Sequence, residues 1–153
     1  MTAFLLFVCQ QLSGINAVVY FSTQIFRDAG VTSAVLSSLL VMLVNVAGTT
    51  FVAAPLIDRF GRTTMLSASY AGMATSMAVM GACLGVPSLA GTSLLTAVTL
   101  LGTVAYVFAF SCGSGPVPSL LVPELFPAEL RGKGGSVAML SHWGWNAVVG
   151  AAF

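Results

Sequence analysis

The feature of this sequence that most limits its fold is the spacing of its charged residues. Residues 1–26, 29–57 and 63–123 carry no acidic or basic side chain, and residues 134–153 carry none apart from His142. A helix that crosses a membrane needs about 20 mostly apolar residues. Three of the uncharged stretches can each hold one such helix, and the stretch 63–123 can hold two. The spacing therefore predicts five membrane-spanning helices.

The composition excludes a soluble domain. Only 6% of the residues are charged and 58% are hydrophobic, whereas charged residues make up about 25% of a typical soluble domain. The net charge of +1 and the lack of a basic patch give no indication of nucleic acid as a partner. Cys9, Cys83 and Cys112 have neither metal-ligand nor disulfide spacing. We therefore expect them to be packing residues, and we expect no metal and no cofactor.

We predict an all-α membrane protein whose first and fourth spans are interrupted. The five spans cover residues 2–25, 35–56, 64–84, 92–122 and 134–153, with a turn near residues 85–88. The first contains Gly14, and the fourth contains Gly115, Pro116 and Pro118. Proline removes a backbone donor, and carbonyls freed within lipid must find partners in the protein. Both breaks should therefore lie beside a cavity or a packed neighbouring helix.

The basic residues predict how the chain is oriented. Lys and Arg favour the cytoplasmic side of a membrane. Arg59 and Arg62 lie between the second and third spans, and Arg131 and Lys133 between the fourth and fifth, whereas Arg27 lies on the other side. The start of the chain then falls on the cytoplasmic side. Neither terminal span has a polar flank beyond it, so we expect this chain to be part of a longer polypeptide.

The first span carries three amide side chains: Gln10, Gln11 and Asn16. A buried amide without a partner costs several kcal/mol. Sugar hydroxyls are suitable partners, because an amide can both donate to them and accept from them; contacts between helices are the alternative. On a straight helix Asn16 would lie about 120–140° from the glutamines. A break at Gly14 could turn all three towards one cavity.

A second polar group lies in the last span. His142, Trp143 and Asn146 share roughly one face of a helix. Trp143 could stack on the apolar face of a sugar ring while His142 and Asn146 meet its hydroxyls. An ionisable residue inside a span is a candidate for function, although a satisfied contact between helices would explain His142 equally well.

The two loops on the predicted cytoplasmic side carry charges of both signs. They are Asp58, Arg59 and Arg62 in one loop, and Glu124 and Arg131 in the other. These side chains could form an ionic cluster that changes during transport. The alternative is a set of solvated loop charges, whose pairs contribute at most about 1 kcal/mol each.

Taken together and in this order, these motifs resemble the sugar porter family of the major facilitator superfamily. They comprise Gln10–Asn16, Asp58–Arg62, the connector at 123–133, and His142-Trp143 with Asn146. The resemblance covers essentially the whole chain and implies helices seven to eleven of a twelve-helix transporter, which is part of its C-terminal half. It also implies that Gly115, Pro116 and Pro118 break helix ten.

The resemblance assigns sugar contacts to six positions: Gln10, Gln11, Asn16, Asn45, Trp143 and Asn146. At two further positions this chain departs from many relatives. Ser119 stands where they have tryptophan, and His142 where they have asparagine. Both are additional candidates for contact with the substrate, and both bear on which sugar is preferred.

The predicted function is transport of a hexose such as glucose by alternating access, with the N-terminal half of the same transporter as the missing partner. A transporter-like sensor that binds sugar without moving it is the alternative. An enzyme is not expected, because no span contains a carboxylate. Residues 111–124 and His142-Trp143 look most like the plastidic glucose transporter branch. That likeness implies the plastid envelope, with the plasma membrane as the other location.

Overall fold

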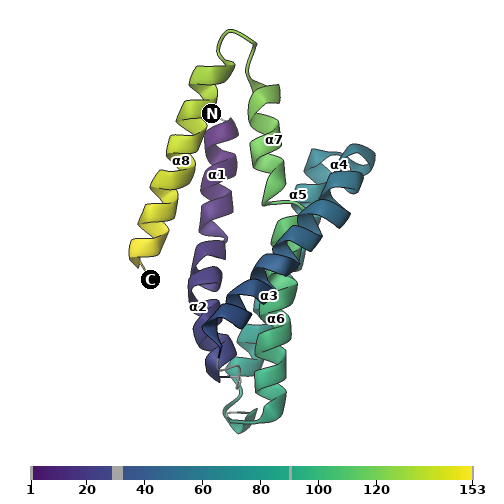
Figure 1. The fold of residues 1–153 in the computed structure, drawn as a ribbon, viewed down its shortest axis with the longest axis vertical. Coiled ribbons are helices and arrows are strands. Elements are labelled where there is room, and N and C mark those ends of the chain that lie inside the picture. Colours follow the sequence, from purple (N-terminus) through teal and green to yellow (C-terminus); the bar gives the residue numbers. More distant parts are fainter. Residues whose placement is uncertain (1, 29–32, 90, 153) are drawn as a thin grey trace.

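The computed structural model describes residues 2–28, 33–89 and 91–152 of the chain, and the described residues form helices without any strand (Figure 1). The helices join into five rods. The rods are α1 (Thr2–Leu12) with α2 (Ile15–Asp28); α3 (Ala34–Ala47) with the π-helix η1 (Gly48–Ala53) and α4 (Ala54–Phe60); α5 (Arg62–Leu84); α6 (Ser93–Cys112) with α7 (Pro116–Leu125); and α8 (Arg131–Ala152). A short 3-10 helix, Pro87–Leu89, forms the predicted turn between the third and fourth rods.

The rods confirm an all-α fold with both predicted interruptions. Residues Ser13 and Gly14 separate α1 from α2, and residues 113–115 separate α6 from α7. Three helical stretches of the described chain are long and apolar enough to cross a membrane: Thr2–Gln24, Ser38–Phe60 and Ser93–Leu125. Helices α5 and α8 have 23 and 22 residues and are therefore long enough to cross. They hold more Gly, Ser and Thr than the three stretches above and are therefore less apolar, so a total of five crossings stays a prediction.

Several rods extend beyond their predicted ends. The second continues to Phe60 rather than 56, with Pro55 in the turn where the π-helix η1 passes directly into α4. The fourth continues to Leu125 with Pro123 inside it. The fifth begins at Arg131 rather than 134, and the last residue of its predicted span, 153, lies outside the described residues. Charged side chains can sit on the terminal turns of these helices because their long stems reach towards water.

Two of the three buried clusters share the broken rods, and the third lies where α4, α5 and α7 meet. In one, α2, α3, α5 and α6 surround a cluster of buried residues: Ile15, Phe26, Val41, Met73, Tyr106 and Val107. In the other, α1, α7 and α8 meet around Ala3, Phe7, Val122 and Ala138. Figure 1 shows these three helices side by side at the end where the chain starts. Each break thus lets one rod contribute a half to each of these two clusters.

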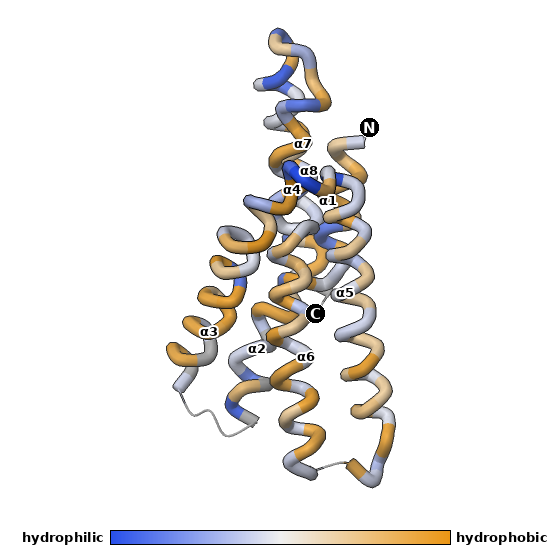
Figure 2. Tube along the Cα trace, turned by 90° about the vertical axis from the view of Figure 1, so that its right-hand side faces the viewer, coloured by the Kyte–Doolittle hydropathy of each residue, from blue (hydrophilic) through white to orange (hydrophobic). Residues whose placement is uncertain are grey.

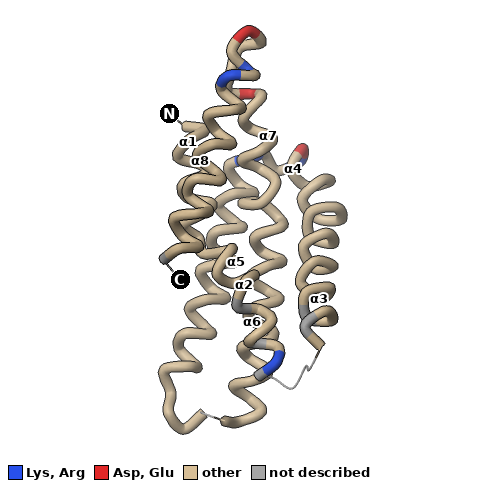
Figure 3. Tube along the Cα trace, turned by 60° about the vertical axis from the view of Figure 1, so that its left-hand side comes forward, with Lys and Arg blue, Asp and Glu red and all other residues tan. Residues whose placement is uncertain are grey.

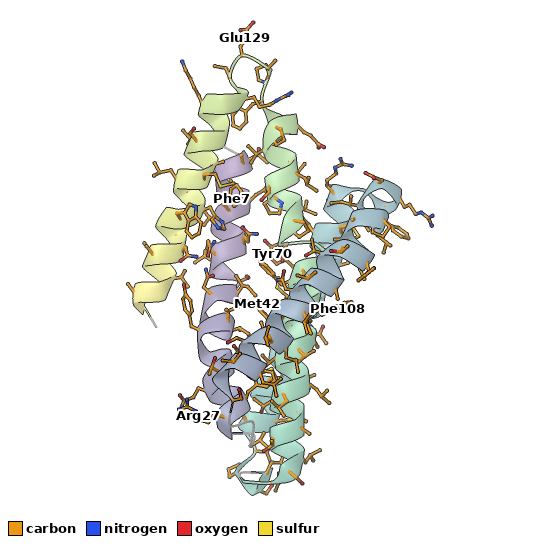
Figure 4. The ribbon with its side chains drawn as sticks, in the orientation of Figure 1. Phe7, Arg27, Met42, Tyr70, Phe108 and Glu129 are labelled. Atoms are coloured by element: carbon orange, nitrogen blue, oxygen red, sulfur yellow. The ribbon has the colours of Figure 1, made fainter. Side chains whose placement is uncertain are left out.

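The outer surface and the charges suit a protein embedded in lipid. Hydrophobic residues run along all the rods in Figure 2, and large apolar side chains such as Phe51 and Leu140 are three-quarters exposed. The described charged residues lie in and beside the loop between α7 and α8 and around the end of α4, with one basic residue near the opposite end (Figure 3). Arg27 lies at one end and Glu129 at the other (Figure 4). The N-terminus lies towards the Glu129 end, and the assignment of this end to the cytoplasmic side stays a prediction.

The first break depends on one glycine. Gly14 has φ +83°, a left-handed conformation that residues with a Cβ rarely adopt. Its N–H donates to Gln11 O at 3.1 Å, and its carbonyl accepts from Val18 N at 3.0 Å. The first α-helix therefore closes and the second one starts within two residues.

We expect Gly14→Ala to lower the free energy of unfolding by about 1–2 kcal/mol, the cost of the left-handed conformation for an L-residue. No atom lies within 4 Å of the added Cβ, so the loss would come from the backbone alone. Unfolding by denaturing detergent, followed by circular dichroism, measures it. Gly144→Ala is the control, because Gly144 is helical and also has open space around it; it should be neutral or stabilising. Equal effects of the two substitutions would contradict this account.

Candidate functional site

The second break leaves backbone groups that other rods bind with side chains. Between α6 and α7, residues Gly113, Ser114 and Gly115 are not helical. Thr49 Oγ1 on η1 lies 3.4 Å from Ser111 O. At closer range, Ser69 on α5 binds Ala109 O and Ser114 N–H, and Gln10 on α1 binds Ser114 O. Lipid offers no hydrogen bonds to such groups, so the break depends on these three neighbouring rods.

Ser69 lies at the centre of the second break and is 3% exposed. Its hydroxyl donates to Ala109 O at 2.7 Å and accepts from the backbone N–H of Ser114 at 2.9 Å. Gly113 allows this close approach, since a Cβ there would lie 2.4 Å from Met65 O and 2.7 Å from Ser69 Cβ. The absence of a side chain at Gly113 therefore lets α5 reach the freed backbone.

Gln10 connects α1 to the same break. Its Nε2 donates to Ser114 O at 2.6 Å and to Gly115 O at 3.1 Å. The connection is reciprocal, because Tyr106 on α6 donates its hydroxyl proton to Ser13 O at the first break, at 2.6 Å. Each interrupted rod thus satisfies backbone groups that the other rod's interruption frees.

The three predicted amides and His142 form one hydrogen-bonded network. Gln11 Nε2 lies 3.0 Å from His142 Nδ1, and Gln10 Oε1 lies 3.2 Å from the same nitrogen. Asn16 donates from Nδ2 to Gln11 Oε1. The break at Gly14 thus brings Asn16 round to the glutamines. Gln10 and Gln11 are almost fully buried, at 4% and 1% exposure.

Trp143 lies at the border of this network. Its ring centroid is 5.2 Å from that of His142, edge to face, and its side chain is 65% exposed. Asn146 and Asn45 are half-buried, and within the described part of the chain neither forms a side-chain hydrogen bond to the network. Asn45 belongs to α3, which packs on α2 and α6. Participation of Trp143, Asn146 and Asn45 in one site with the glutamines stays a prediction.

Three apolar cavities lie outside the network. Ser119 lines one of 340 Å³ between α7 and the η1–α4 rod, together with Thr49 and Pro116. Another of 340 Å³ lies between α1 and α8, and one of 500 Å³ lies between α5 and α6. None of the six predicted sugar contacts lines any of them.

The two charged loops meet through one arginine. Arg62 Nη2 lies 2.7 Å from Glu124 Oε1, and Arg62 Nη1 lies 3.9 Å from Asp58 Oδ1. Arg59 and Arg131 take no part in an ion pair with any described side chain. Because the paired side chains are 36–79% exposed, each pair adds little stability. The contact does join the start of α5 to the end of α7.

Sequence reasoning missed Ser69, Ser114 and Tyr106. Hydroxyl side chains inside spans are common here, and most bond their own helix: Thr75 to Ala71 O and Thr103 to Thr99 O, for example. Only the structure distinguishes these from Ser69 and Tyr106, which bond a different rod. The signal that could have indicated them is the need of each broken helix for external partners.

Comparison with known proteins gives one family. The family described as "Sugar (and other) transporter" matches residues 1–153. Plastidic glucose transporter 4 of Arabidopsis thaliana is 47% identical over 97% of this chain, which covers 27% of that protein. Probable plastidic glucose transporter 1 of the same plant is 42% identical over 97% of this chain and 28% of its own length. A facilitated trehalose transporter of Apis mellifera ligustica is 40% identical over 92% of this chain and 28% of its own length.

We expect Ser69→Ala to lower the free energy of unfolding by about 1–3 kcal/mol, because Ala109 O and Ser114 N–H would be buried without that partner. Unfolding by denaturing detergent measures the loss. Ser67→Ala is the matched control on the same helix, since Ser67 is exposed and should change stability by less than about 0.5 kcal/mol. A Ser69→Ala protein as stable as the control would remove Ser69 from the account of the break.

Proposed function

The chain belongs to the sugar transporter family, and from this we propose that it takes part in moving a hexose such as glucose across a membrane by alternating access. It is a multi-pass membrane protein of a family of transporters rather than enzymes. The chain spans between 27% and 28% of the length of the three relatives named above. A second set of helices would complete the pathway for the sugar.

The observation that carries the proposal is the network of Gln10, Gln11, Asn16 and His142. Its side chains are amides and an imidazole, and none is a carboxylate or an ammonium group. A neutral hexose offers hydroxyls that both donate and accept, which matches amides. Atoms of Asn16 and His142 that make no bond within the network, such as Asn16 Oδ1, are available to such hydroxyls. The exposed Trp143 ring beside His142 offers an apolar surface for the sugar ring.

The names of the relatives support glucose over a disaccharide. The plastidic glucose transporters are 42–47% identical to this chain, and the facilitated trehalose transporter of the bee is 40% identical. The same names support the plastid envelope as the location. We extend both points to this chain as part of the proposal.

The two broken rods suggest how the sugar would be released. Discontinuous helices that line a central site are common in transporters of this kind of architecture. Here Gln10 binds the α6–α7 break, and its Oε1 faces His142 Nδ1, so a sugar at the network would contact a residue that holds the break. The Arg62–Glu124 pair would be made in one state and separated in the other. The ion pair can shift the equilibrium between these two states only by as much as its own free energy differs between them.

In the complete transporter, we expect Gln11→Ala to weaken glucose binding about tenfold, equivalent to about 1.4 kcal/mol. The loss reflects one hydrogen bond to sugar and the disturbed partners His142 and Asn16. Equilibrium binding of labelled glucose to purified protein measures it. Gln24→Ala is the control, because Gln24 is exposed on the next helix. Unchanged affinity in a folded Gln11→Ala protein would remove Gln11 from the site.

We expect Glu124→Gln to slow turnover while glucose affinity stays the same, because it removes the pair with Arg62 on α5 and leaves the amide network intact. Counterflow in proteoliposomes gives the turnover, and equilibrium binding gives the affinity. Glu129→Gln is the matched control, since Glu129 is exposed and forms no ion pair with a described residue. Lost binding together with normal turnover would contradict a role in conformational change.

A further inference from the structure

One nitrogen of His142 faces two amide atoms of opposite polarity. Nδ1 lies 3.0 Å from Gln11 Nε2, which is a donor, and 3.2 Å from Gln10 Oε1, which is an acceptor. An imidazole nitrogen carries either a lone pair or a proton. At any moment Nδ1 can therefore accept from Gln11 or donate to Gln10, but it cannot do both.

The polarity of each amide is fixed by its other partners. Gln10 Nε2 is bound to the carbonyls of Ser114 and Gly115, so Gln10 Oε1 is the atom left to face the imidazole. Gln11 Oε1 accepts from Asn16, so Gln11 Nε2 is the atom left to face it. Rotating Gln10 by half a turn would break its bonds to Ser114 and Gly115, and Gln11 could rotate only if Asn16 rotated with it. The opposed pair is therefore a consequence of the two helix breaks.

The surroundings of His142 contain no described charged side chain in contact with its ring. The rings of Phe7 and Trp143 both meet the imidazole edge to face, each with its ring centroid 5.2 Å from that of His142. The described titratable side chains on the elements packed against α8 are Cys9 on α1, Tyr20 and Arg27 on α2, and Glu124 on α7; all of these are exposed. On α8 itself Arg131 and Lys133 are exposed, and Lys133 lies nine residues, about 13 Å along the helix, before His142.

We propose that His142 is a positioning residue for the sugar, and that the state of its Nδ1 decides which glutamine is free to bond a sugar hydroxyl. This inference rests on the proposed function of the network. With a lone pair on Nδ1, Gln11 is held and Gln10 Oε1 is free to accept from the sugar. With a proton on Nδ1, Gln10 is held, and two N–H groups face each other at Gln11. Gln11 must then move, and its bond with Asn16 is disturbed.

Histidine and asparagine at position 142 should differ in how they bond the two glutamines and in how they respond to pH. An asparagine has its donor and its acceptor on different atoms, so it could serve both glutamines at once, and it does not titrate in the physiological range. Histidine changes its protonation between about pH 5 and 8. The affinity for sugar should therefore depend on pH with histidine and should not with asparagine.

The first test measures glucose KM and kcat of the complete transporter between about pH 8 and 5, for the unchanged protein and for His142→Asn. Acidification places a proton on Nδ1, which occupies Gln10 Oε1 and disturbs the bond between Gln11 and Asn16, so affinity should weaken about threefold to tenfold, with a smaller change in kcat. His142→Asn should give a flat KM profile. A flat profile in the unchanged protein, or the same slope in both proteins, would overturn the proposal.

The second test reads the imidazole without transport. Nitrogen NMR of the protein labelled at histidine, with the signal assigned by its loss in His142→Asn, gives the pH of half-protonation. Gln11→Met removes the donor to the neutral ring and should raise this pH, whereas Gln10→Met removes the acceptor from the protonated ring and should lower it. Shifts of the same sign, or none, would overturn the proposal. If the two variants shift the pH of half-protonation in opposite directions but the protein binds no hexose, the proposed function is refuted. The exchange of His142 between the two glutamines would then still hold.

Discussion

The pairing of backbone groups at the two helix breaks is the constraint on which this structure depends. Lipid supplies no hydrogen bonds, so each interrupted helix needs partners within the protein. Here the partners come from other rods: Ser69 and Gln10 at the second break and Tyr106 at the first. The same bonds fix how the rods are placed relative to one another. The interruptions are thus points of attachment between rods as well as points of bending.

The polar network follows from this constraint. Gln10 is held by the carbonyls of the α6–α7 break, and Asn16 reaches Gln11 only because Gly14 redirects the chain. His142 then completes the group from α8. The site of the proposed sugar contact and the bending points of the helices are therefore built from the same residues. A ligand that rearranged the amides would act directly on the backbone of the second break.

The sequence predicted the helices, the two interruptions and the closeness of Asn16 to the glutamines, because each follows from a strong local rule. Uncharged stretches mark helices in lipid, and glycine and proline mark breaks. It predicted neither Ser69 nor Tyr106, because a hydroxyl in a helix can bond its own backbone, as Thr103 does, and nothing local distinguishes the two cases. Asn45 shows the opposite limit: the resemblance predicts a sugar contact there, yet the described residues give it no bond to the network.

Helix α7 acts mechanically as a short lever. Its ten residues span about 15 Å, with the non-helical Gly113–Gly115 segment at one end and Glu124 near the other. A rotation of about 10° at the break would carry the far end through about 2.5 Å, a distance set by the length of the helix. That displacement is comparable to the 2.7 Å separation of Arg62 Nη2 and Glu124 Oε1. A change of angle of this size therefore suffices to separate the ion pair.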